Sequence, residues 1–367
     1  MQTHIKKLFK VLLCFIIIFN AFFFFACASI TKVEIPQSGV SRNGRLEVIK
    51  DENGVMRLAN QKGAFISLRG MSTYNFNRVI VGDDSQNLLN DNAFSALRED
   101  WKCNVIRLAV YVRSEDNGYN GMKEDTMKNI DKAVKLATDN DMYVIIDWHV
   151  LFPGDPTHET YQFAQDFFTS VAKKYGKTKN VMFEIMNEPN SYTMADVIFW
   201  EHIKPYAENM VKLIRKYSNN IIIIGNPSWS QRPDICAENP IEGKNLMYSV
   251  HFYAGSHGQE LRDNITSALE NGAAVFCTEW GVTNNTGNGE VYLSPEDGGV
   301  SDASTWLDFL DEHKISWCNW SISAKSENSA ALLKTTSLNP KNGLWEVDEL
   351  SASGQFVRER LRSYIDL

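Results

Sequence analysis

The sequence predicts an α/β fold, in which eight parallel strands alternate with helices and close into a (β/α)8 TIM barrel. Eight near-continuous apolar runs occur along the 367 residues, as is typical of parallel strands that are buried on both faces. Amphipathic segments separate most of these runs, which is the alternation found in a barrel. From about residue 42 to residue 367 there is no linker, repeat or change of composition, so we predict a single domain.

Each apolar run has the length of a strand. Marker residues near the ends of successive runs are 25 to 42 residues apart, a spacing that fits one strand and one helix. The predicted strands are 64–70, 105–111, 142–149, 181–188, 221–226, 246–253, 274–281 and 315–321. A further pattern over 46–58 predicts a short N-terminal hairpin that covers the bottom of the barrel.

The segments between the strands predict helices, because their apolar residues recur with helical spacing. The predicted helices are 91–101, 125–140, 161–175, 196–217 and 302–313. Several begin with an aspartate, such as Asp91 and Asp302. An aspartate at this position can accept hydrogen bonds from the free backbone N–H groups of the first turn, so we predict that it caps the helix.

The N-terminus predicts an export signal. Lys6, Lys7 and Lys10 precede an apolar run over 11–26 that only Asn20 interrupts. This run is shorter than the about 20 residues of a membrane span, and small residues follow it, as at a cleavage site. We therefore predict a signal peptide at 1–26, an N-terminal linker at 27–41 and the barrel domain at 42–367.

Two modes of processing fit the end of this signal. The residues Ala26-Cys27-Ala28 match the A-x-A cleavage pattern of a freely secreted protein. Cys27 also fits a bacterial lipoprotein that a lipid anchors to the membrane, although Phe24 and Phe25 match that pattern poorly. We favour lipidation of Cys27. We therefore expect a secreted protein or a cell-surface lipoprotein of a bacterium, and we expect the protein to be a monomer.

The charge and the cysteines limit the possible partners. The net charge is −8, and removal of the signal with its lysines makes it more negative, which disfavours nucleic acid as a partner. The four cysteines beyond Cys27 lie mostly in or beside apolar runs, so we predict buried thiols. No cysteine spacing resembles a zinc site, and we expect neither a metal nor a cofactor.

Polar residues gather near the carboxyl ends of the predicted strands, where the loops of a barrel build its active site. Asn187 and Glu188 close one run, and Glu279 lies near the end of another. Two such carboxylates suggest a glycosidase, since cleavage needs one acid for the leaving oxygen and one carboxylate for the charge at the anomeric carbon. Glu188 before a proline would alone be weaker, because that pair is also common in turns.

The motifs at these positions resemble the family 5 glycoside hydrolases, the cellulase family, and in particular its bacterial endo-β-1,4-glucanases. The resemblance covers essentially the whole predicted barrel domain and rests on seven motifs in the same order. They are GMS at 70–72, NVIRLAVY at 104–111, VIIDWH at 144–149, NEPN at 187–190, SVHFYAG at 249–255, TEWG at 278–281 and SWCNWS at 316–321.

The resemblance implies that Glu188 is the general acid/base and Glu279 the nucleophile of a retaining double displacement. The residues themselves support these roles. An ionised nucleophile needs cationic or hydrogen-bonding neighbours, and Arg107 and Tyr253 can supply both. A negative Glu279 about 5 Å away would keep Glu188 protonated until the covalent intermediate forms. The alternative for Arg107 is a salt bridge that only stabilises the barrel rim.

The resemblance also implies a set of sugar-binding residues. Asn187 would donate to the sugar 2-hydroxyl beside the cleaved bond, an interaction that strengthens in the transition state. His149, His251, Tyr111 and Tyr253 would line the sugar at the cleavage point. A structural role or metal binding is the alternative for the histidines, and the lack of a local ligand cluster argues against metal.

Two tryptophans resemble the stacking platforms of the family, Trp229 on the leaving-group side and Trp320 on the retained side. Flat aromatic walls suit the apolar faces of sugar rings. The alternative for both is a place in the core. Lys325 and Glu327 match a polar pair that binds a sugar beyond the cleavage point, and a solvated loop is their alternative.

Two positions depart from the pattern of the close relatives, which commonly carry a histidine and a tryptophan where this chain has Tyr74 and Arg78. These departures leave the number of subsites and the preferred polymer open. The predicted function is a secreted, retaining endo-β-1,4-glucanase that cleaves internal bonds of cellulose or related β-glucans.

Two kinds of protein are alternatives to this function. One is a mannanase, xylanase or xyloglucanase of the same family, because loops rather than the barrel choose the sugar. The other is a surface glycan-binding protein without catalysis, against which the presence of both Glu188 and Glu279 argues.

Overall fold

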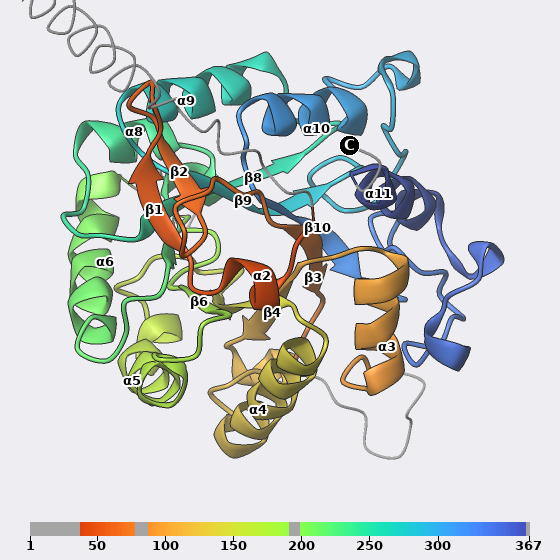
Figure 1. Cartoon of the computed structure of the whole chain (residues 1–367), viewed down its shortest axis with the longest axis horizontal. Helices are drawn as coiled ribbons and strands as arrows, with labels where there is room; N and C mark the ends of the chain where they lie inside the picture. Colours follow the sequence, from red (N-terminus) through yellow and green to blue (C-terminus); the bar gives the residue numbers. More distant parts are fainter. Residues whose placement is uncertain (1–36, 78–86, 191–198, 365–367) are drawn as a thin grey trace, which may run out of the picture. The chain divides into compact units, whose positions relative to one another are not determined.

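The computed structural model describes residues 37–77, 87–190 and 199–364, and these residues form a closed barrel of eight parallel strands (Figure 1). Neighbouring strands follow the order β10, β3, β4, β5, β6, β7, β8 and β9, after which the barrel closes. The strands are β3 (Arg69–Thr73), β4 (Val105–Tyr111), β5 (Tyr143–His149), β6 (Val181–Glu184), β7 (Ile222–Ile224), β8 (Leu246–Tyr253), β9 (Val275–Gly281) and β10 (Trp317–Ile322). The predicted fold class is confirmed.

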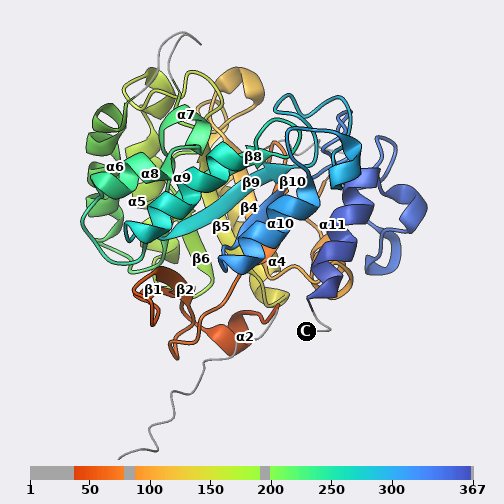
Figure 2. The same ribbon diagram turned by 90° about the horizontal axis from the view of Figure 1, so that it is seen from above.

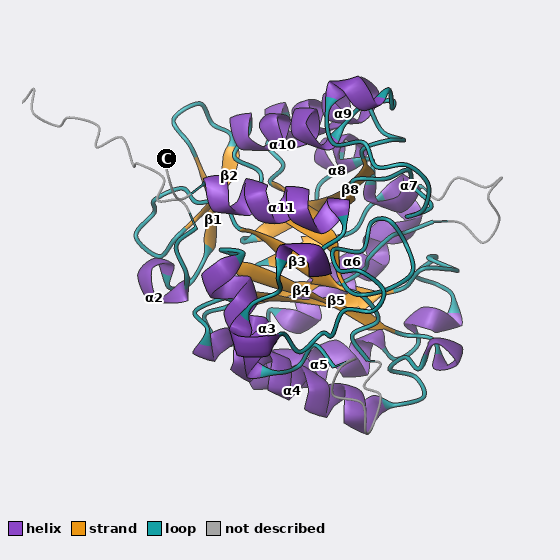
Figure 3. Ribbon diagram, turned by 90° about the vertical axis from the view of Figure 1, so that its right-hand side faces the viewer, coloured by secondary structure: helices purple, strands orange, loops and turns teal. Residues whose placement is uncertain are grey.

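Helices surround the barrel on its outer side (Figure 3). The helices are α3 (Asp91–Ser95), α4 (Lys123–Asp139), α5 (Ala164–Tyr175), α6 (Trp200–Ile214), α8 (Pro233–Glu238), α9 (Gln259–Glu270), α10 (Ala303–Glu312) and α11 (Ala352–Ser363), together with the short α2 (Val40–Asn43) and α7 (Pro227–Ser230). In the part of the chain that the structure describes, no helix is both long and apolar enough to cross a bilayer.

The predicted hairpin is present. Strands β1 (Glu47–Lys50) and β2 (Met56–Ala59) pair antiparallel and lie at the end of the barrel opposite α7 (Figure 2). Val48 and Leu58 of the hairpin share a buried cluster with Val105 and Phe276, which begin β4 and β9. The hairpin therefore closes the amino-terminal end of the barrel, as predicted.

One predicted strand is misplaced, because β3 begins at Arg69 rather than at residue 64. Ile66 and Leu68 are buried in the cluster beneath the barrel, and the Ile66 N–H donates to the carbonyl of Leu58 at 3.0 Å. Residues 64–68 are thus apolar because they cross under the barrel. Strand β6 also ends earlier than predicted, at Glu184, which places Glu188 in the loop that follows.

The helix caps were partly predicted. The Asp302 carboxylate accepts a hydrogen bond from the Thr305 N–H at 2.9 Å and caps α10, as expected. The prediction for Asp91 was wrong, since the cap of α3 is the preceding residue, Asn90, whose side chain accepts from the Ala93 N–H at 2.8 Å. Helix α3 then continues into a π-helical turn, Ala96–Asp100. The start predicted for α6 at residue 196 lies outside the described residues.

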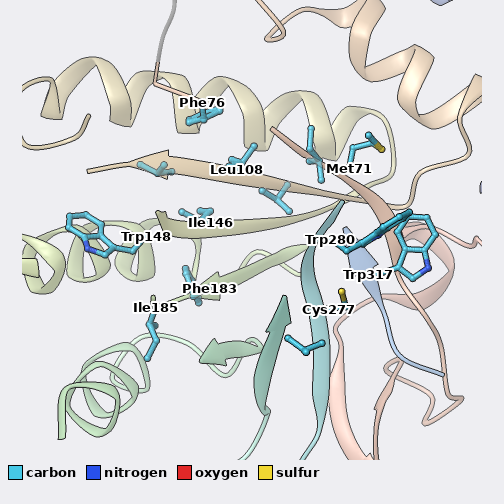
Figure 4. Packing of buried hydrophobic residues seen from close by; sticks show 14 of the residues in the cluster. Met71, Phe76, Leu108, Ile146, Trp148, Phe183, Ile185, Cys277, Trp280 and Trp317 are labelled. Atoms are coloured by element: carbon cyan, nitrogen blue, oxygen red, sulfur yellow. The ribbon is translucent and has the colours of Figure 1, made fainter. Parts of the chain in front are cut away.

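Strand geometry separates the core from the barrel interior. Leu108, Ile146 and Phe183 belong to the large cluster between the strands and the surrounding helices (Figure 4). Successive side chains of a strand point to opposite faces, so the residues beside them, Arg107 and Asp147, point into the barrel. The described cysteines Cys103, Cys236, Cys277 and Cys318 are free and buried, which agrees with the predicted thiols.

Candidate active site

The two glutamates singled out by the sequence meet in the mouth of the barrel. Glu279 lies on β9, and Glu188 lies in the loop after β6. One oxygen of each carboxylate and one nitrogen of His251 all lie within 4.8 Å of one another. Glu279 is 5% exposed and Glu188 is half-buried, so Glu279 is the more enclosed of the two carboxylates.

Glu279 is held by the two neighbours that the sequence predicted. Arg107 Nη1 lies 2.9 Å from Glu279 Oε2, and the Tyr253 hydroxyl donates to Glu279 Oε1 at 2.9 Å. The two contacts use both carboxylate oxygens and orient the group. Burial, together with the charges of Glu279 and Glu188, raises the pKa of Tyr253 above its ordinary value, so this phenol keeps its proton for donation.

Arg107 is the centre of a buried ion network. Its side chain is fully buried; its Nε lies 2.7 Å from Glu184 Oε2, and its Nη2 lies 2.9 Å from Asp147 Oδ2. Nη2 also donates to Asn187 Oδ1 at 2.7 Å. Burial would lower the pKa of Arg107, but the three carboxylates Asp147, Glu184 and Glu279 raise it well above its ordinary value. Arg107 therefore both contacts the site and stabilises the barrel interior.

Asp147 and Glu184 were missed by the sequence reasoning. Burial would raise the pKa of Glu184, but the charges and hydrogen bonds of Arg107 and His251 together outweigh it and hold that pKa at about 2. The signal that could have found them is their place in the strands. Asp147 precedes His149 by two residues and Glu184 precedes Glu188 by four, so an alternating strand would turn each toward the same interior as its predicted partner.

His251 connects Glu188 to the network. Its Nδ1 lies 2.9 Å from Glu188 Oε1, and its Nε2 lies 2.9 Å from Thr278 Oγ1. The Thr278 hydroxyl donates to Glu184 Oε1 at 2.7 Å. Burial would lower the pKa of His251, but the nearby carboxylates of Glu184, Glu188 and Glu279 raise it to about 9. These carboxylates therefore favour the positively charged form of His251.

His149, in contrast to His251, has a lowered pKa and an uncharged ring. Its Nδ1 lies 2.7 Å from Asp147 Oδ2, while burial and the charge of Arg107 hold the pKa of His149 at about 3. A neutral imidazole with a proton on Nδ1 leaves Nε2 as an acceptor, and this nitrogen has no partner among the described atoms. The ring stacks with Trp320 at 5.4 Å and lies 4.7 Å from Tyr111.

The residues predicted for the retained side lie together. The Trp320 Nε1–H donates to Glu327 Oε1 at 3.1 Å, and Glu327 forms an ion pair with Lys325. Lys325 Nζ lies 4.3 Å from the centre of the Tyr74 ring. Trp320 is only 5% exposed, so much of the predicted platform is covered by its neighbours. Arg78 lies outside the described residues.

Trp229 lies in a different environment. It is 38% exposed, and its backbone N–H donates to the carbonyl of Pro189 at 3.1 Å, beside the loop that carries Glu188. Its φ of 57° is left-handed, a conformation that Ser228 and Ser230 share. The turn leaves the indole partly exposed to solvent, and its backbone contacts the loop that carries Glu188.

One group of three described side chains has donor atoms close enough for a cation, and it consists of Glu188, His251 and Glu279. His251 Nδ1 faces Glu188, while Arg107 and Tyr253 occupy the Glu279 oxygens. These donors are engaged with one another and with cationic or protonated partners, which fits an acid and a nucleophile better than a ligand set.

The family model described as cellulase (glycosyl hydrolase family 5) matches residues 59–326. The chain belongs to glycoside hydrolase family 5. The cellulase CelDZ1 of a Thermoanaerobacterium species is 45% identical to this family 5 hydrolase over 334 residues, which cover 87% of this chain and 82% of that relative. The chain spans only 42% and 36% of the length of two longer bacterial endoglucanases.

Solved structures agree with this assignment. A thermostable and highly halotolerant GH5 cellulase from an Icelandic hot spring isolate has a TM-score of 0.81 and 43% identity, with 89% of this chain and 97% of that chain covered. The catalytic domain of Thermobifida fusca endoglucanase Cel5A, solved as a variant in complex with cellotetraose, has a TM-score of 0.74 and 32% identity, with 88% and 99% covered. This family 5 protein is thus a glycoside hydrolase of the cellulase type.

Proposed function

We propose that the chain is a retaining endo-β-1,4-glucanase, with Glu188 as general acid/base and Glu279 as nucleophile. The observation that carries this proposal is the approach of the Glu188 and Glu279 oxygens to within 4.8 Å. Retaining glycosidases hold their two carboxyl groups about 5–5.5 Å apart, whereas inverting enzymes need about 6.5–9.5 Å to admit a water molecule.

The chemistry follows from these positions. Glu279, oriented by Arg107 and Tyr253, attacks the anomeric carbon while Glu188 protonates the leaving oxygen and the glycosidic bond breaks. Glu188 then takes a proton from water, whose oxygen displaces Glu279 and releases the sugar with its original β configuration. One Asn187 Nδ2 proton is used by the Val150 carbonyl at 3.3 Å, and the second is available to the sugar 2-hydroxyl.

We infer that β-glucan polymers and their oligosaccharides are the substrate class. The exposed Trp229, whose backbone contacts the loop that carries Glu188, and the aromatic group around Trp320 support binding of sugar rings by stacking. The cellotetraose bound to the Thermobifida fusca relative supports the same class. The choice among cellulose, mixed-linkage glucan, xyloglucan and glucomannan rests with the loops, and the mannanase and xylanase alternatives would be separated by product analysis on a panel of soluble polymers.

Glu188→Gln and Glu279→Gln test the roles. Each variant is expected to keep the fold, as measured by circular dichroism, while losing about 10²–10⁴-fold in hydrolysis rate. NMR of the first products should show the β anomer, and an activated fluorinated glycoside should label Glu279. Release of the α anomer first would disprove the retaining mechanism, and labelling of another carboxylate would reassign the nucleophile.

We also propose export, with lipidation at Cys27 and attachment to the cell surface as a monomer. The N-terminal pattern described above supports it. The mass of the mature N-terminus separates the two modes of processing. A lipid on Cys27 in the membrane fraction supports anchoring, whereas a soluble protein that begins at Ser29 supports cleavage after the A-x-A pattern.

A further inference from the structure

Glu184 is a fully buried carboxylate that contacts both halves of the catalytic apparatus without lining the mouth. One oxygen, Oε2, lies 2.7 Å from Arg107 Nε, and Arg107 in turn holds Glu279. The other oxygen, Oε1, accepts from Thr278 at 2.7 Å. Through Thr278 the chain of contacts continues to His251, at 2.9 Å. The double displacement derived above leaves Glu184 without a role.

We propose that Glu184 is a positioning residue that keeps His251 in its imidazolium form, and thereby confines the exchangeable proton of Glu188 to the oxygen that His251 does not contact. The proposal rests on the proposed function of Glu188 as acid/base. It assigns to Glu184 control over that residue rather than contact with the sugar.

The hydrogen-bond inventory supports the first half of this proposal. An ionised carboxylate only accepts hydrogen bonds, so the single hydroxyl proton of Thr278 must point to Glu184. The Thr278 oxygen then accepts from His251, which requires a proton on His251 Nε2. Ser249 Oγ, 3.1 Å from the same oxygen, can donate to its second lone pair. Glu184 thus fixes the protonation of one ring nitrogen through a single intermediate group.

The charges around His251 support an imidazolium with both nitrogens protonated. Glu184 of β6 lies 3.8 Å from Nε2, Glu188 lies 2.9 Å from Nδ1, and Glu279 of β9 adds a third negative charge. The remaining ionisable groups of the network are Arg107 of β4, which is engaged by its own carboxylates, and Asp147 of β5, whose pKa burial raises well above its ordinary value. Negative groups therefore outnumber positive ones around the ring, and they stabilise its positive form.

The consequence for catalysis concerns which oxygen of Glu188 carries the proton. With Nδ1–H donating to Glu188 Oε1, a proton on Glu188 is favoured on Oε2, because the carbonyl oxygen is the better acceptor. That proton passes to the leaving oxygen in the first step, and Oε2 takes one from water in the second. The Nδ1–H contact with Oε1 persists in both states, so Glu188 keeps its orientation while its charge changes.

The test is the pH dependence of kcat/KM on a soluble β-1,4-glucan for Glu184→Gln, which removes the charge and keeps the shape. Without the negative charge, the coupled Glu188–His251 pair holds its protons less tightly, so activity is lost at lower pH. We expect the alkaline limb to move down by about 1–3 pH units, as is typical of an ion partner at this distance. Glu184→Asp keeps the charge, so the alkaline limb of its kcat/KM profile should lie at the same pH as in wild type, even if its kcat is lower.

A merely structural role for Glu184 would lower kcat in both variants without separating their alkaline limbs, and that result would overturn the proposal. It would leave the proposed function standing, because that function depends on the loss of activity in Glu188→Gln. Should Glu184→Gln be inactive or unfolded, ¹⁵N NMR of histidine-labelled wild type decides. Protons on both ring nitrogens of His251 at pH 7 support the proposal, and a neutral ring contradicts it.

Discussion

Replacing Arg107 with lysine tests the buried ion network most directly. Three nitrogens of Arg107 point to different partners, with Nε toward Glu184, Nη1 toward Glu279 and Nη2 toward Asp147. A lysine carries its charge on a single nitrogen and cannot span these directions, so at least one carboxylate loses its cationic contact. Breaking a buried ion pair costs about 3–5 kcal/mol, so we expect the free energy of unfolding at pH 7 to fall by about that amount.

The pH dependence gives the prediction its sign. The pKa of Glu184 is held at about 2 in the folded protein, below its ordinary value of 4.5. Its contribution to stability is therefore present above pH 4.5 and is lost as the pH falls toward 2. Because Arg107→Lys lacks much of this contribution at neutral pH, the stability difference from wild type should shrink as the pH falls from 4.5 toward 2.

Urea unfolding followed by tryptophan fluorescence at pH 7 and pH 4 measures both quantities. Arg215→Lys is the matched control, since Arg215 is largely buried but donates to the backbone carbonyls of Ser218, Asn220 and Lys244. Its loss of stability should be the same at both pH values. An Arg107→Lys difference below about 1 kcal/mol at pH 7, or one unchanged at pH 4, would refute the network argument.

Three further outcomes are expected. Tyr253→Phe removes the 2.9 Å hydrogen bond to Glu279, which contributes about 1.5–3 kcal/mol. The kcat/KM of this variant should therefore fall about 10- to 150-fold. A variant with wild-type kinetics would show that the bond is dispensable. Trp320→Ala should lower kcat/KM on cellotetraose about tenfold or more, because an aromatic contact with the sugar is lost. The kcat/KM of Trp320→Phe should lie between those of wild type and Trp320→Ala. An unchanged kcat/KM in Trp320→Ala would show that Trp320 is only a core residue. The His251 pKa of about 9 exceeds its ordinary 6.5, so its stabilising contribution, roughly 3 kcal/mol, is full below pH 6.5 and lost as the pH rises through 9. The unfolding free energies of wild type and His251→Asn should therefore converge over that range, and a constant difference would contradict an imidazolium.

The barrel could be predicted because its strands follow a physical rule that the sequence displays. A strand covered on both faces must be apolar along most of its length, as 105–111 and 246–253 are. The same rule misplaced β3, since Ile66 and Leu68 are buried beneath the barrel and burial alone does not distinguish a strand from a crossing segment. Asn90 rather than Asp91 caps α3 because either side chain can accept the bond, and tertiary packing decides the register.

The sequence predicted the site residues whose type and position indicate their chemistry. It missed a residue whose role depends only on its partners in the folded structure. Glu188 lies in the loop after β6 and Glu279 near the end of β9, and their contacts to His251 and Tyr253 agree with the expected lining. Glu184 lies within an apolar run, and a single acid there is equally compatible with many structural roles. Its importance depends on bonds to Arg107 and Thr278 from other strands, which no local pattern contains.

The hairpin that closes the amino-terminal end of the barrel blocks the barrel axis below the catalytic centre, so no channel runs through the described barrel. Val48 and Leu58 fill the bottom with side chains, so nothing can be threaded through the axis. A polymer far longer than the barrel is wide must lie across the mouth. An internal segment of the polymer can therefore bind, and cleavage does not require a chain end. In the proposed double displacement, the water of the second half-reaction and both products use the same opening, so the leaving fragment departs before water enters.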